Sequence, residues 1–141
     1  MNTPFRRVIL SLTAVIGLCV GIWAEFFHRS FYDTFPGLGL HWLIMMGPFN
    51  DHLISDVGSF YLALSAISIT AIFTRSAFPG RLAGLGWAIF GVLHFYYHAT
   101  NLMGSTTDRV GNLVTLGLSA LLGIILLFPS RRPLTTKENP Q

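Results

Sequence analysis

Four long apolar segments, separated by shorter polar stretches, dominate the pattern of this chain. They run from about 8 to 27, 51 to 73, 82 to 101 and 111 to 128. A bilayer core about 30 Å thick is crossed by about 20 apolar helical residues. Backbone polar groups inside lipid have to be bonded within their own segment, which favours helices. The pattern therefore predicts an all-α fold: one domain, residues 1–130, built as an antiparallel bundle of four transmembrane helices.

The residues that flank these segments are typical of helix ends. Asn50 precedes the second segment as an N-cap would, Pro79-Gly80 separates the second from the third, and Pro129 follows the fourth. The connection 74–81 is short, so the second and third helices should be antiparallel neighbours.

Two other parts of the chain behave differently. The connection 30–50 is long and apolar, with Trp42 among its aromatic residues, and we expect it to lie over the mouth of the bundle or in the membrane interface. The tail 131–141 is polar and contains proline, so it is predicted to be a disordered cytoplasmic segment.

Composition and charge support a membrane protein. The chain is 52% hydrophobic and 11% charged, whereas a soluble domain usually carries about 25% charged residues. A net charge of +3 without a dense basic patch argues against nucleic acid as a partner. No cleavage site follows the first apolar segment, so we expect a retained span rather than a signal peptide.

The placement of Lys and Arg predicts the orientation. Seven of the nine fall at the chain ends or in the connection 74–81, and only Arg29 and Arg109 fall in the other two connections. The positive-inside rule then places both termini in the cytoplasm. The expected location is the plasma (inner) membrane, with the lipid bilayer as one partner and a membrane protein or a second copy of the chain as another.

The other ionisable residues gather toward the outward-facing half. All five histidines and five of the six acids lie there. Residues three or four apart share a helix face, which predicts one small or polar stripe on each helix. These stripes are Gly21, Glu25, His28; then His52, Asp56, Ser59, Ala63, Ala66, Thr70; then Gly84, Trp87, Gly91, His94, His98, Asn101; and finally Asn112, Thr115, Ser119. Because such residues face the interior of membrane bundles, the stripes are expected to converge.

Several kinds of chemistry would fit such a centre. His52, Asp56, His94 and His98 form a nitrogen and oxygen ligand set suited to Zn, Fe or Cu. A haem between the second and third helices is another alternative. His94, Asp56 and Glu25 could instead perform acid–base catalysis or relay protons.

Non-catalytic interpretations stay open beside these. The polar centre could fix helix register only, in a small structural or accessory subunit of a membrane complex, or it could bind or transport a small ligand or a proton. For Met45-Met46 a copper role is conceivable, with loop packing as the alternative. Cys19 is a lone cysteine inside an apolar run and is interpreted as a small packed side chain.

Two motifs carry a resemblance to known proteins. The stretch 47–64, which begins Gly-Pro-Phe-Asn-Asp-His, and the later His94-x3-His98 resemble uncharacterised four-helix bacterial membrane proteins of actinobacterial type. The four-span layout is similar to that of DoxX-like membrane proteins. This resemblance implies a membrane bundle and an association with redox homeostasis, and it supplies no catalytic residues.

Overall fold

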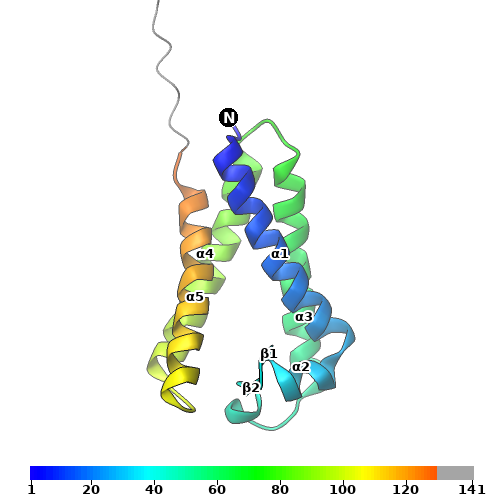
Figure 1. The fold of residues 1–141 in the computed structure, drawn as a ribbon. Coiled ribbons are helices and arrows are strands. Elements are labelled where there is room, and N and C mark those ends of the chain that lie inside the picture. The colour runs from blue at the N-terminus through cyan, green and yellow to red at the C-terminus, as the bar shows by residue number, and fades with distance from the viewer. Residues whose placement is uncertain (130–141) are drawn as a thin grey trace, which may run out of the picture.

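The structure, a computed structural model, describes residues 1–129 and is built from helices (Figure 1). The long helices are α1 (Pro4–Phe26), α3 (Asp51–Ile72), α4 (Phe78–Thr100) and α5 (Thr106–Leu127). The connection between α1 and α3 contains the short elements α2 (His28–Thr34), β1 (Pro36–Gly37), β2 (Leu40–His41) and the 3-10 turn η1 (Ile44–Met46). The all-helical prediction is confirmed. The predicted disordered tail, 131–141, lies outside the described residues.

The helix starts follow capping chemistry. The Asn50 side chain accepts a hydrogen bond from the Leu53 amide at 3.0 Å at the start of α3. At the start of α5, Ser105 and Asp108 form a reciprocal capping box. Both arrangements bond amides that would otherwise lack partners in the first turn.

The four helices form two antiparallel pairs, α1 with α3 and α4 with α5 (Figure 1). The pairs meet at the end that holds the N-terminus and diverge toward the opposite end. Residues 27–50, which we call the cap, lie at that opposite end, the cap end. The divergence matters because it separates the cap-end half of α3 from that of α4.

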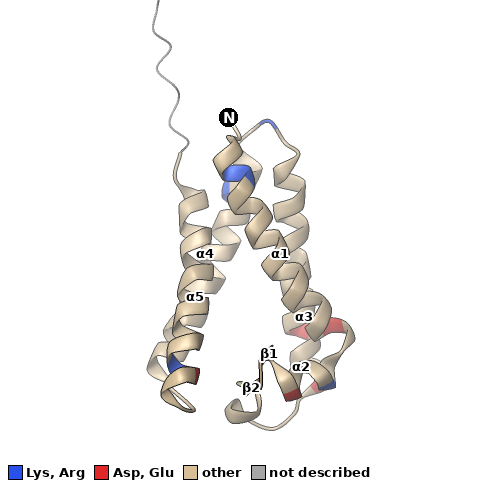
Figure 2. Ribbon diagram, viewed as in Figure 1, with Lys and Arg blue, Asp and Glu red and all other residues tan. Residues whose placement is uncertain are grey.

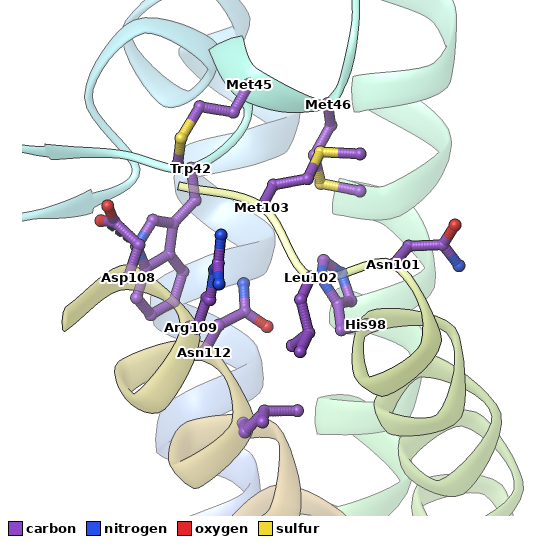
Figure 3. Close-up of a pocket in the computed structure, with 11 residues that line it drawn as sticks. Trp42, Met45, Met46, His98, Asn101, Leu102, Met103, Asp108, Arg109 and Asn112 are labelled. Carbon is purple, nitrogen blue, oxygen red and sulfur yellow. Dashed lines mark hydrogen bonds between the residues drawn. The ribbon is translucent and has the colours of Figure 1, made fainter. Parts of the chain in front are cut away.

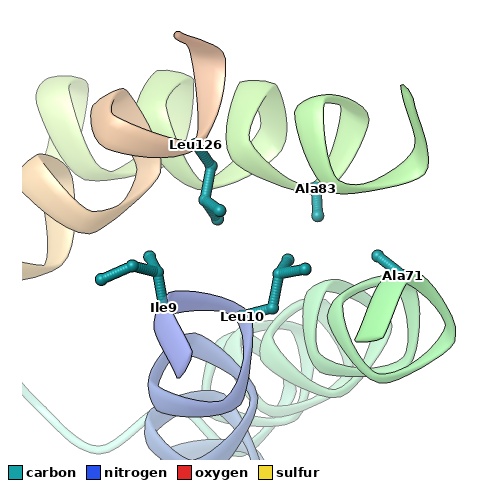
Figure 4. Packing of buried hydrophobic residues seen from close by; sticks show 5 residues of the cluster. All are labelled: Ile9, Leu10, Ala71, Ala83 and Leu126. Atoms are coloured by element: carbon teal, nitrogen blue, oxygen red, sulfur yellow. The ribbon is translucent and has the colours of Figure 1, made fainter. Parts of the chain in front are cut away.

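An apolar cluster holds the pairs together near the N-terminal end (Figure 4). It combines Ile9 and Leu10 of α1 with Ala71 of α3, Ala83 of α4 and Leu126 of α5. Within the pairs the backbones approach closely at glycines. A Cβ at Gly58 would lie 2.5 Å from the Glu25 amide nitrogen of α1, and one at Gly123 would lie 2.5 Å from an amide nitrogen of α4.

Buried polar side chains bond one another in the middle of the bundle. The Trp87 indole donates to the Ser68 hydroxyl at 3.0 Å, and the Thr13 hydroxyl lies 3.3 Å from the same oxygen. Ser68 in turn donates to the Leu64 carbonyl at 2.9 Å. This network ties α1, α3 and α4 together without leaving its hydroxyls unbonded.

Three of the four long helices in residues 1–129, namely α1, α3 and α5, are long and apolar enough to cross a membrane. The sequence predicts four spans, and α4 is the one outside this set. Its 23 residues are sufficient in length, but they include Arg81, His94 and His98, which lower the mean hydropathy.

The inward face predicted for α3 is wrong. Ser59, Ala63, Ala66 and Thr70 are exposed, and the buried face instead carries Ile54, Gly58, Tyr61, Leu64, Ser65, Ser68 and Ala71. Small and polar residues occur on both faces of this helix, so composition does not choose between them. The close approach of α1 at Gly58 does.

Candidate functional site

The cap is a folded unit with its own aromatic core. Phe31 and Phe35 of this segment have ring centroids 4.7 Å apart, and Trp23 of α1 packs against Phe31 at 5.7 Å. Trp42 completes the cluster, with its ring centroid 6.0 Å from that of Phe35. The predicted placement of this connection over the mouth of the bundle matches its position at the cap end (Figure 1).

A tight hairpin brings Trp42 to this position. β1 and β2 pair in antiparallel fashion, with Pro36 opposite His41. The turn between them has positive φ at Gly37 (97°) and Gly39 (77°), a conformation that glycine adopts at little cost. The sequence Pro-Gly-Leu-Gly-Leu therefore reverses the chain over a few residues and directs the next segment toward α5.

Trp42 joins the cap to α5. Its Nε1 donates to Asp108 Oδ1 at 3.2 Å, and its ring lies over Gly111, where a Cβ would be 3.2 Å from the indole. The other carboxylate oxygen of Asp108 accepts from the Ser105 hydroxyl at 2.6 Å and the Ser105 amide at 2.9 Å. One carboxylate thus caps α5 and anchors the cap.

A small pocket lies between the cap and the ends of α4 and α5 (Figure 3). Its volume of about 20 Å³ is enough for roughly one water molecule or a single ion. Its lining combines thioethers, amides, an imidazole and a guanidinium: Trp42, Met45, Met46, His98, Asn101, Leu102, Met103, Asp108, Arg109, Asn112 and Leu113.

Two polar groups of the pocket have no hydrogen-bond partner within residues 1–129. The Asn112 Oδ1 atom is buried and accepts no hydrogen bond. His98 is 9% exposed, and its described contacts are ring contacts, with His94 at 4.8 Å and Tyr97 at 5.6 Å between centroids. Buried acceptors without a protein partner are typical of positions where a water or an ion is bound.

The stripe predicted on α4 faces the protein over most of its length, whereas its last member, Asn101, is exposed. Trp87, Gly91 and His98 are buried, and His94 is half-buried with its ring stacked on Phe90 at 5.1 Å. His94 and His98 therefore face the protein, as the His-x3-His spacing predicts, and their rings touch each other.

The other predicted site residues lie elsewhere. His52 and Asp56 face each other on α3 at 3.5 Å, with side chains 89% and 61% exposed. Glu25 is half-buried and accepts a hydrogen bond from the Ser55 hydroxyl at 3.1 Å. His28 pairs with Asp51 at 2.6 Å and joins the cap to the start of α3.

The predicted metal set of His52, Asp56, His94 and His98 is not assembled. Within residues 1–129, no three His, Cys, Asp or Glu side chains gather at a point that could hold a metal ion. Asp56 and Glu25 pair instead with His52 and Ser55, respectively, and neither interacts with His94 within residues 1–129. The physical reasons are the rotation of α3, which turns its histidine outward, and the divergence of the helix pairs toward the cap end.

The sequence interpretation placed Asn112 on a stripe expected to converge with that of His98, but it missed Met103, which lines the same pocket. A signal for Met103 existed, because every methionine other than Met1 falls in a connection at the cap end. No periodicity links residues 45–46 with residue 103, since they meet only through the folded cap.

The fold and pocket define a class: an all-helical protein with three span-capable helices and a capped pocket at one end. Comparison with protein-family models, with curated proteins and with solved structures finds no match for this chain.

Proposed function

We propose that the protein is a four-span protein of the plasma membrane with both termini in the cytoplasm. The support is topological. α3 ends at the N-terminal end of the bundle and α5 begins at the cap end, so α4 has to pass between them (Figure 1). Its 23 residues extend about 34 Å at 1.5 Å per residue, enough for a bilayer core.

Charge supports the orientation. Arg6, Arg7, Arg75 and Arg81 belong to the N-terminal end of the bundle, whereas five acidic residues, together with only Arg29 and Arg109, belong to the cap-end half; Figure 2 shows this distribution along the ribbon. The flanks of the helices also carry exposed apolar side chains, among them Val15, Ile22, Leu85, Ile89 and Leu118. Lipid, rather than water, suits such a surface.

Cysteine labelling on intact cells tests this topology. In a Cys19→Ala background, a single cysteine at Gly39 of the cap should react with a membrane-impermeant maleimide, and one at Ser76 should react only after the membrane is opened. The reverse pattern would invert the orientation. Labelling of both sites in intact cells would refute the four-span layout.

The function that we infer is the binding of a small ion at the outward-facing pocket. The observation that carries it is the buried, unpaired Asn112 Oδ1 inside a pocket with room for one ion. The small volume argues against an organic substrate. Asp56 pairs with His52 and Glu25 accepts a hydrogen bond from Ser55, so within residues 1–129 neither carboxylate interacts with His94, which argues against acid–base catalysis by that set.

Amide hydrogen exchange of the full chain in lipid nanodiscs tests this function. The probes are Ag(I), Zn(II), Ca(II) and chloride, added singly. An ion held between the cap and α5 should slow exchange in residues 40–46 and 101–109 together. Asn112→Leu should abolish the response, and the matched change Asn101→Leu, at an exposed amide of the same pocket, should reduce it less. Unchanged exchange with all four ions would refute the function.

A further inference from the structure

The distribution of methionine points to the kind of ion. The chain has four methionines, and three of them, Met45, Met46 and Met103, line this one pocket. They come from the cap and from the connection between α4 and α5. Figure 3 shows the sulfur atoms of Met46 and Met103 directed toward the same region. Packing alone would be satisfied by leucine, which is abundant in this chain, so the shared property of interest is the thioether.

The remaining donors of the pocket complement these sulfurs. The His98 imidazole belongs to the pocket lining and makes ring contacts with His94 and Tyr97, and the Asn112 Oδ1 atom is a buried, unused acceptor. Met45 packs against the connection between α4 and α5, because a Cβ added at Gly104 of that connection would lie 2.9 Å from the Met45 Sδ atom. Met46, Met103, His98 and Asn112 therefore supply two soft donors, one imidazole and one carbonyl.

We propose that the pocket binds a soft monovalent transition-metal cation, Cu(I), through the thioethers of Met46 and Met103 and the imidazole of His98, with the Asn112 Oδ1 atom completing the site. Thioether ligands select Cu(I), whereas carboxylate and carbonyl oxygens suit Mg²⁺ and Ca²⁺. This assignment rests on the proposed function and names the ion for it. Each methionine of the pocket is 37–38% exposed, which leaves a path for the ion to enter and leave.

The charges around the pocket disfavour other ions. Its one carboxylate, Asp108, already accepts hydrogen bonds from Ser105 and Trp42. A hard divalent cation would therefore lack free anionic oxygens. Arg109 also lines the pocket and opposes a doubly charged cation more than a singly charged one. An anion attracted by Arg109 is the competing occupant, and it would not need the sulfurs.

The test is a titration of the full chain in nanodiscs with Ag(I), a redox-inert substitute for Cu(I). A Cys19→Ala background removes the exposed thiol, which would bind the same ions. We expect one equivalent of Ag(I) per chain. Binding should weaken at least tenfold in Met46→Leu/Met103→Leu, which nearly conserves side-chain volume. His98→Gln should weaken it similarly, while the matched change at the exposed His52, His52→Gln, should leave it unchanged.

A measurement without pocket substitutions accompanies the titration. With 13C-labelled methionine methyl groups, one equivalent of Ag(I), or of Cu(I) kept reduced by ascorbate, should shift the signals of Met46 and Met103 but not that of Met1. Equal affinity in the double variant, or no shift of these two signals, overturns the proposal. If Zn(II), Ca(II) or chloride slows exchange around the pocket while Ag(I) does not, the ion assignment fails and the proposed function stands. If none of the ions does so, both fail.

Discussion

Arg6 offers the sharpest test of how the two helix pairs are joined. It lies in the first turn of α1, is 4% exposed, and reaches across to the end of α5. Its Nη1 donates to the Phe128 carbonyl at 2.8 Å and its Nη2 donates to the Leu126 carbonyl at 2.7 Å. These carbonyls belong to the last turn and the C-cap of α5, where intrahelical donors run out. Arg6→Met keeps the apolar stem and removes both bonds.

The size of the effect follows from these two bonds. A hydrogen bond to a charged group contributes about 1.5–3 kcal/mol, and the favourable contact with the helix C-terminus adds about 0.3–1 kcal/mol. Water at the membrane surface can replace part of this bonding. We therefore expect Arg6→Met to lower the free energy of unfolding by about 3 kcal/mol. Arg6→Lys should recover part of that loss, because an ammonium group donates without the paired geometry of the guanidinium.

Denaturant titration of the full chain in mixed micelles measures these values. The matched control is Arg7→Met, which removes the same charge from an exposed neighbouring position and should cost less than about 0.5 kcal/mol. Equal losses for Arg6→Met and Arg7→Met would mean that charge at the membrane surface, and not the bonds to α5, provides the stabilisation. The reasoning would then be refuted.

Three further changes probe packing, the polar network and the cap. Gly123→Ala places a Cβ 2.5 Å from the α4 backbone and should destabilise the protein by about 1–3 kcal/mol in the same titration. In the matched change Gly117→Ala, the new Cβ would lie 3.5 Å from its nearest neighbour, the Phe95 ring, so this change should be neutral or stabilising. Ser68→Ala leaves the buried indole of Trp87 without its acceptor and should lower the free energy of unfolding by about 1–3 kcal/mol. The Trp fluorescence emission of the folded protein should shift as the indole loses its partner. Trp42→Phe removes the hydrogen bond to α5 and should speed amide exchange in residues 36–46; unchanged exchange there would show that aromatic packing alone holds the cap.

Much of the fold follows from local sequence. The apolar segments, the N-cap at Asn50, Pro79 at the start of the third helix and Pro129 after the fourth placed the four long helices within about five residues of their observed bounds. The buried stripe on α4 was also predictable, because its glycines, Trp87 and the two histidines share one face. These properties depend on the hydrophobicity and spacing of neighbouring residues, which the chain carries wherever the other helices lie.

The candidate site was predictable only in part. His98 lies in the pocket as a member of the predicted centre, but its neighbours are Met46, Met103 and Asn112 in place of His52 and Asp56. Two helix faces of α3 had similar small and polar residues, and the choice between them depends on the approach of α1 at Gly58. Contacts between distant segments decide such choices, and a single sequence does not specify them.

By itself, the sequence determined four long helices, an apolar surface and a separation of basic from acidic ends, since each is a sum over local residues. Only the tertiary structure decided which polar side chains meet. The two helix pairs diverge, the cap folds between them, and its hydrogen bond from Trp42 to Asp108 brings residues 45–46 to residue 103. The physical reason is that a pocket is defined by the relative rotation and separation of whole helices, which packing sets after each helix has formed.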